Sequence, residues 1–230
     1  MSDYKFTIDF WNEDHYKNFR EVCLQLSLSS LGTKDSTVEV LEIGTFEGRT
    51  ITKILDVVHN SNAVIVDPDP GPNFHHNLDR WFDSGRLSWL EKYSFDALTG
   101  FKGHVFDFIY IDGDHNANGV LEDAVLSWRI LKKGGILLFD DYLMEIGDPW
   151  FYMMHKEFSE YKGVTFHHPK EAIDAFLAVY KGQYELIIDN YQIGVKKICE
   201  IGKKNLNNGE DNADTFLKRS LYNVQHSGID

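Results

Sequence analysis

The sequence predicts an α/β protein with a doubly wound, mostly parallel seven-stranded sheet, a C-terminal antiparallel hairpin and helices on both faces. Apolar runs alternate with segments of helical periodicity from residue 37 to residue 182, which is typical of parallel strands joined by helical crossovers. Runs such as ILLF (136–139) are apolar throughout, as in strands buried on both faces. Two runs within residues 184–197, turning at Asp189 and Asn190, predict the hairpin.

Composition restricts the class of protein further. The 230 residues suffice for one sizeable domain, and the net charge of -13 disfavours nucleic acid and anionic membranes as partners. Cys23 and Cys199 lack metal-site spacing, which favours free thiols in a reducing compartment. The first ten residues lack the apolar core of a signal peptide, and no apolar run has the length of a membrane span. We therefore expect a cytoplasmic protein.

The first half of the chain begins with a predicted helix within residues 11–31, because apolar residues from Phe19 to Leu26 recur at helical spacing before Gly32. The elements that follow are a strand (37–44), a helix (48–60), a strand (63–67), a short helix (74–82), a strand (86–93), a short helix (94–101) and a strand (105–112).

In the second half, a helix over 119–135 is closed by a double glycine and precedes a strand over 136–142. Helices over 149–163 and 169–182 then lead to the hairpin. The last residues are polar, with a further short helix within 214–222.

In sheets of this kind a ligand binds beyond the carboxyl ends of the strands. The first strand ends in LEIGTFEGRT (41–50), where Gly44 and Gly48 would let a ligand approach the backbone and the helix N-terminus. Asp67 ends the next strand, where an acid can bind both hydroxyls of a ribose. Both features also have a structural interpretation, since glycine is common in such turns and aspartate is common before proline.

Acidic residues also end the fourth and fifth strands, in YIDGDH and LLFDDY. Asp112, Asp140 and Asp141 would meet at neighbouring strand ends, where mutual repulsion favours a divalent cation such as Mg²⁺ between them. The alternative is that the two adjacent aspartates only cap a strand. His115 follows Asp112 by three positions and could be a general base, a metal ligand or an exposed loop residue.

Over residues 37–198 the sequence resembles the Rossmann-like class I S-adenosylmethionine-dependent methyltransferases. The stretch FDFIYIDGDHNANGVLEDAVLSWRILKKGGILLFDDY is the most specific, together with LEIGTFEGRT, VIVDPDP and EAIDAFLAVY. Within the class, the sequence resembles metal-dependent O-methyltransferases of the macrocin and mycinamicin type and, more distantly, catechol O-methyltransferase. The resemblance implies three parts: an N-terminal helical segment (1–36), a cofactor-binding methyltransferase domain (37–198) and a polar tail (199–230).

The resemblance also implies roles for individual residues. Those expected to contact S-adenosylmethionine are Glu42, Gly44, Thr45, Gly48, Thr50, Asp67, Ser94 and Asp112. Among them, Thr50 would bind the carboxylate of the methionine end, Asp67 the ribose, and Ser94 would lie by the adenine. Asp112, Asp140 and Asp141 match the metal ligands, and His115 matches the general base.

The chemistry agrees with these roles, because methylation of a hydroxyl requires an aligned acceptor and removal of its proton. We therefore predict Mg²⁺-assisted O-methylation of a small molecule, with a sugar or another vicinal diol or catechol as acceptor. Three alternatives stay open: a non-catalytic cofactor-binding scaffold, another nucleotide-cofactor α/β enzyme, and a methyltransferase without a metal. The sequence does not identify the acceptor, and it leaves open whether the protein is a monomer or a homo-oligomer.

Overall fold

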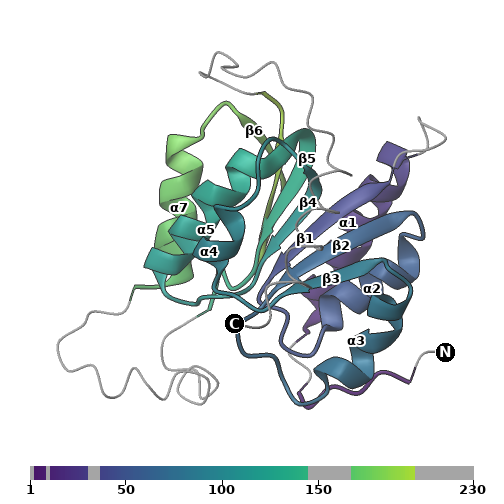
Figure 1. The fold of residues 1–230 in the computed structure, drawn as a ribbon. Helices are drawn as coiled ribbons and strands as arrows, with labels where there is room; N and C mark the ends of the chain where they lie inside the picture. The colour runs from purple at the N-terminus through teal and green to yellow at the C-terminus, as the bar shows by residue number, and fades with distance from the viewer. Residues whose placement is uncertain (1–2, 9–10, 31–36, 145–166, 200–230) are drawn as a thin grey trace, which may run out of the picture. The chain divides into compact units, whose positions relative to one another are not determined.

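The computed structural model describes residues 3–8, 11–30, 37–144 and 167–199. Its sheet has seven strands in the order β3-β2-β1-β4-β5-β7-β6 (Figure 1). Strands β1 to β5 pair in parallel, whereas β7 is antiparallel to both β5 and β6. The predicted fold class is therefore confirmed, including the C-terminal hairpin.

The strands are β1 (Val38–Ile43), β2 (Ser61–Val66), β3 (Leu87–Leu90), β4 (Phe106–Ile111), β5 (Leu131–Phe139), β6 (Tyr184–Asp189) and β7 (Ile193–Lys197). The helices are α1 (Glu13–Ser30), α2 (Arg49–Val57), α3 (Phe74–Asp83), α4 (Ser94–Leu98), α5 (Ala117–Ile130) and α7 (Pro169–Val179). The helices predicted over 149–163 and within 214–222 lie outside the described residues. None of the described helices is both long enough and apolar enough to cross a membrane.

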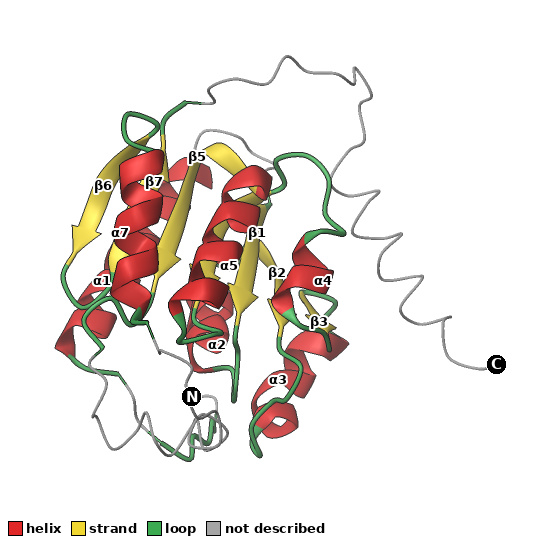
Figure 2. Cartoon of the chain, turned by 90° about the vertical axis from the view of Figure 1, so that its left-hand side faces the viewer, coloured by secondary structure: helices red, strands yellow, loops and turns green. Residues whose placement is uncertain are grey.

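Helices cover both faces of the sheet, with α1, α2 and α3 on one side and α4, α5 and α7 on the other (Figures 1 and 2). Alternate strand residues form the core under α1 to α3, among them Val40, Ile65 and Leu138. On the opposite face, Phe139 packs against Phe176 of α7. This alternation decides which side each polar residue at a strand end will face.

Helix α1 contributes to the same core as the sheet, through Val22, Cys23 and Leu26. Asn12 caps the start of α1, because its side-chain Oδ1 accepts the backbone N–H of His15 at 3.2 Å. The capped first turn of α1 therefore carries His15 in a fixed orientation.

One predicted boundary is wrong: helix α5 ends at Ile130, and residues 131–135 belong to β5 instead of the helix. The amine of Lys197 in β7 donates to the carbonyl oxygens of Trp128 and Leu131, both at 2.9 Å, and so caps the helix end. Leu131 then pairs with Phe106 and Ile136 with Phe108, so that the four residues Lys132–Gly135 lie opposite Asp107 alone. Such a bulge is difficult to distinguish from a helix end in the sequence.

Candidate active site at the carboxyl ends of the strands

The turn between β1 and α2 depends on two glycines. Gly44 and Gly48 have φ of 78° and 80°, a region that favours glycine. A Cβ on Gly44 would lie 1.9 Å from the backbone oxygen of Asp112, and one on Gly48 would lie 2.6 Å from Leu78. The predicted glycine turn thus lies directly against the backbone that follows β4.

Asp67 holds this turn in place from the end of β2. Its Oδ2 accepts the backbone N–H groups of Thr45 at 2.8 Å and Phe46 at 2.7 Å, and its Oδ1 accepts that of Asp69 at 2.9 Å. Phe46 has a φ of 48°, which is uncommon for a residue other than glycine. The carboxylate of Asp67 therefore stabilises the loop on which the predicted cofactor site depends.

Glu42 lies beneath the same turn and is only 2% exposed. The hydroxyl of Thr45 donates to its Oε2 at 3.0 Å. Burial raises the pKa of Glu42 to about 8; the charge of Asp67 adds to this, and bonds from Thr45 and Thr50 oppose it. Glu42 therefore retains its proton to a higher pH than an exposed glutamate does, and in the protonated form its carboxyl group can donate as well as accept a hydrogen bond.

Ser94 is the first residue of α4 and lies beside Asp123 of α5. Asp123 is 1% exposed, and neither of its carboxyl oxygens has a hydrogen-bond partner within normal distance among the described residues. Burial raises the pKa of Asp123 to about 7, and the neighbouring Ser94 hydroxyl opposes this only in part. A buried carboxyl group therefore lies next to the residue predicted to contact the adenine.

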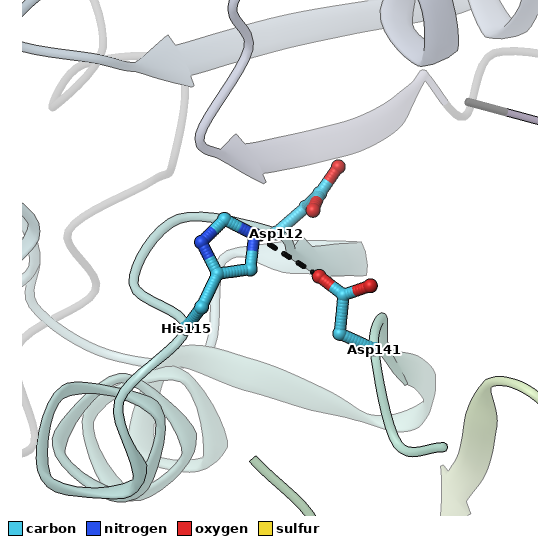
Figure 3. A group of neighbouring side chains, drawn as sticks. All are labelled: Asp112, His115 and Asp141. Carbon is cyan, nitrogen blue, oxygen red and sulfur yellow. Dashed lines mark ion pairs between the residues drawn. The ribbon is translucent and has the colours of Figure 1, made fainter. Parts of the chain in front are cut away.

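Asp112, His115 and Asp141 converge beyond the ends of β4 and β5 (Figure 3). One ligand atom from each lies within 4.8 Å of the others. His115 Nε2 lies 3.0 Å from Asp141 Oδ2, and the hydroxyl of Tyr191 donates to Asp141 Oδ1 at 2.8 Å. We refer to Asp112, His115 and Asp141 as the acid–histidine cluster.

Carboxyl groups are crowded together in and around the acid–histidine cluster. Burial raises the pKa of Asp112 well above its usual range, and the charges of Asp140, Asp141 and Glu42 raise it further. Burial lowers the pKa of His115, but its bond to Asp141 and the neighbouring carboxylates outweigh this, so that the net pKa is raised. A bound cation would remove this repulsion, and carboxylate and imidazole are donors that divalent ions accept. The residues present therefore fit a divalent cation.

Asp140, the third predicted ligand, lies outside this cluster and faces helix α1. Its carboxylate accepts from His15, Gln192 and Tyr110, whose hydroxyl bonds to Oδ2. Burial raises the pKa of Asp140, but the bond and charge of His15, together with the Tyr110 and Asp141 bonds, lower it below its usual value. Asp140 is thus surrounded by hydrogen-bond donors from other parts of the chain, whereas its neighbour Asp141 faces His115.

Asp114 has a local role in the same loop. Its Oδ1 accepts the backbone N–H of Asn116 at 2.8 Å, just before α5 begins. A Cβ on Gly119 would lie 2.1 Å from the other carboxyl oxygen of Asp114, so the helix packs directly against this side chain. Asp114 therefore shapes the start of α5 and lies outside the acid–histidine cluster.

Residues 41–142 match the family model described as a methyltransferase domain. The chain carries a methyltransferase domain. The match includes both the glycine turn and the acid–histidine cluster, and it confirms the predicted resemblance to class I S-adenosylmethionine-dependent methyltransferases.

Solved structures share the fold of this methyltransferase domain at low sequence identity. A protein of Klebsiella pneumoniae described as a candidate O-methyltransferase has a TM-score of 0.58 at 12% identity, over 84% of each chain. A candidate caffeoyl-CoA O-methyltransferase of Staphylococcus aureus has a TM-score of 0.52 at 13% identity, over 82% of this chain and 86% of its own. At such identities the similarity concerns the fold alone.

A curated relative is an uncharacterised protein of Acanthamoeba polyphaga mimivirus, 29% identical over 125 residues. The aligned segment spans 50% of this chain and 56% of the viral protein, so this chain matches about half the length of that relative.

The sequence did not predict four residues that contact Asp140 or Asp141 at the candidate site: His15, Tyr110, Tyr191 and Gln192. Tyr110 had a signal, because it precedes Asp112 by two positions on one strand and so shares its face. His15 and Gln192 had none, since their contacts with Asp140 cross 125 and 52 residues of sequence.

Proposed function

We propose that this protein is an S-adenosylmethionine-dependent O-methyltransferase that acts on a hydroxyl group of a small molecule with the help of a divalent cation, Mg²⁺ or a similar ion. The acid–histidine cluster carries the proposal, because it combines cation ligands and a proton acceptor at the strand ends beside the glycine turn. A sugar or another vicinal diol or catechol is the favoured acceptor, since two adjacent hydroxyls can chelate one ion.

The cofactor would lie over the turn formed by Gly44, Thr45 and Gly48. Glu42 and Thr50 lie buried beneath this turn, near the expected position of the methionine end. Asp67 already accepts three loop N–H groups, and because a carboxylate offers about four lone-pair positions, it would accept one ribose hydroxyl while it continues to hold the loop. Ser94 would flank the adenine, and Asp112 would border the cofactor as well as the cation.

Asp112 and Asp141 would hold the cation, with His115 beside them. A bound S-adenosylmethionine supplies a methyl group activated on its sulfonium, and a bound divalent cation lowers the pKa of a coordinated hydroxyl. The His115 imidazole would accept the hydroxyl proton at Nδ1, because Nε2 faces the Asp141 carboxylate and carries the hydrogen of that contact. The Asp141 carboxylate, 3.0 Å away, would then stabilise the protonated ring and keep its orientation.

The test is a methyl-transfer screen over sugars, catechols and small phenols, with Mg²⁺ or with EDTA, read by formation of S-adenosylhomocysteine. Cation-dependent turnover of a hydroxyl acceptor is expected. Turnover that persists in EDTA, in protein shown to be metal-free, would contradict the cation requirement. Thermal stabilisation by NAD but not by S-adenosylhomocysteine would favour another nucleotide-cofactor enzyme.

A non-catalytic scaffold is the remaining alternative. It predicts that S-adenosylhomocysteine binds but that no acceptor is methylated in the presence of any divalent cation.

A further inference from the structure

Asp140 is enclosed by hydrogen-bond donors of the protein itself. Its Oδ1 accepts from His15 Nε2 at 3.2 Å, from Gln192 Nε2 at 3.2 Å and from the backbone N–H of Asp141 at 2.9 Å. Its Oδ2 accepts from the hydroxyl of Tyr110. The side chain is 8% exposed. These four donors occupy a group that offers about four lone-pair positions, so little capacity remains for a cation.

The side-chain donors are themselves fixed by other contacts. The second ring nitrogen of His15, Nδ1, lies 2.8 Å from Asn12 Oδ1, and the ring stacks on Trp11 with centroids 6.1 Å apart. The Oε1 of Gln192 accepts from the side-chain amide of Asn18 at 2.9 Å. Asp140 therefore sits in a preformed polar network that links α1 to the turn before β7.

Strand alternation explains why Asp140 faces this network. Ile136 and Leu138 belong to the core that also contains Val22 and Leu26 of α1, and Asp140 continues their register. Asp141 turns back toward His115 through a φ of 57°, a left-handed conformation that is unfavourable for residues other than glycine. The bond from the Asp141 N–H to Asp140 Oδ1 holds this unfavourable conformation.

We infer that Asp140 is not a cation ligand but the residue that anchors helix α1 to the cation site, with His15 as the positioning residue that fixes it. The inference rests on the cation site of the proposed function. By holding the backbone N–H of Asp141, Asp140 sets the direction in which the Asp141 carboxylate points. Helix α1 is then part of the machinery that shapes the site.

The experiment measures Mn²⁺ binding to the full chain without acceptor, by electron paramagnetic resonance and calorimetry, beside thermal unfolding. Asp140→Asn retains a carbonyl oxygen that can accept from His15 and Asp141, so its Mn²⁺ affinity should stay close to wild type. Asp140→Ala removes the anchor and should weaken binding by about 10- to 100-fold, as is typical for residues that orient metal ligands. Asp141→Asn should weaken it more than Asp140→Ala does.

His15 is tested through a pair of variants. The side-chain amide of glutamine can replace the Nε2 donor of histidine, so His15→Gln should retain the Mn²⁺ affinity that His15→Ala loses. Asp79→Asn is the matched control, because Asp79 pairs with His75 at 2.9 Å on an exposed surface. Its Mn²⁺ affinity should equal that of the wild type.

Two results would overturn the inference and leave the proposed function intact. One is an Asp140→Asn variant that folds normally and loses Mn²⁺ as completely as Asp141→Asn. The other is a His15→Ala variant that melts earlier and binds Mn²⁺ with wild-type affinity, since α1 would then serve stability alone. Failure of the wild-type protein to bind Mn²⁺, while it binds S-adenosylhomocysteine, would overturn both the inference and the cation requirement.

Discussion

The backbone of Gly44 lies against the carbonyl group of Asp112, at a distance that leaves no space for a side chain. A Cβ at position 44 would lie 1.9 Å from the Asp112 oxygen. The cofactor turn and the acid–histidine cluster are therefore joined through backbone atoms, which cannot move aside as a flexible side chain can.

Gly44→Ala should therefore destabilise the fold and displace Asp112. Gly103→Ala is a matched control, because Gly103 also has a φ of 78° and a Cβ there would meet nothing within 4 Å. In this control the free energy of unfolding should fall by about 1–2 kcal/mol, the cost of a left-handed backbone conformation for alanine. Gly44→Ala should lose clearly more, as measured by urea unfolding. Equal losses would show that the contact with Asp112 is easily relaxed.

Asp67→Asn should loosen the glycine turn. The amide can offer only one oxygen, whereas Asp67 accepts the N–H groups of Thr45, Phe46 and Asp69 with both of its oxygens. An N–H left without an acceptor costs about 1–3 kcal/mol. Hydrogen exchange at Thr45 and Phe46 should accelerate, and S-adenosylhomocysteine should bind more weakly by at least about tenfold. Asp69→Asn is the control, because the side chain of Asp69 is exposed; it should leave hydrogen exchange at Thr45 and Phe46 and the affinity for S-adenosylhomocysteine unchanged.

His115→Ala should separate chemistry from cofactor binding. Removing a general base typically lowers the rate by about 10²- to 10⁴-fold, whereas the glycine turn that would bind the cofactor is unchanged. The measurements are kcat with an acceptor from the methyl-transfer screen and calorimetric affinity for S-adenosylhomocysteine. His75→Ala, at an exposed histidine, is the control. Full turnover by His115→Ala would exclude the proposed base.

Asp123 should make stability depend on pH. Its pKa is about 7 in the folded protein against 3.8 for the ordinary group, so folding binds a proton between these values. The stability this proton contributes is complete below about pH 4 and is lost as the pH rises through about 7. Asp123→Asn should match the wild type near pH 4 and exceed it near pH 8, by up to about 4 kcal/mol.

Urea unfolding at both pH values measures this difference, with Asp83→Asn, at an exposed position, as a control for the loss of one negative charge. Equal stability of the wild type and Asp123→Asn at pH 8 would contradict the prediction, because ionised Asp123 would then have gained a hydrogen-bond or ion-pair partner.

Much of the fold could be predicted because its strands are apolar on both faces and separated by helical periodicity. The cluster of Asp112, His115 and Asp141 was anticipated from strand ends, since parallel strands bring those ends to one edge. The sequence could not show that Asp140 faces His15 whereas Asp141 faces His115, because two adjacent aspartates give no sign of which side chain lies on which face of the sheet. His15 was missed because the rotation of α1 against the sheet is a tertiary property.

The four-residue segment Lys132–Gly135 opposite Asp107 controls more than a strand end. It sets the parity of every residue that follows in β5, since each step along a strand reverses the face. With one residue fewer, Asp140 would point toward α5 and α7, and Phe139 would point toward α1. The length of a surface segment at the far end of the strand thereby selects which of two chemically identical neighbours meets His15 and which meets His115.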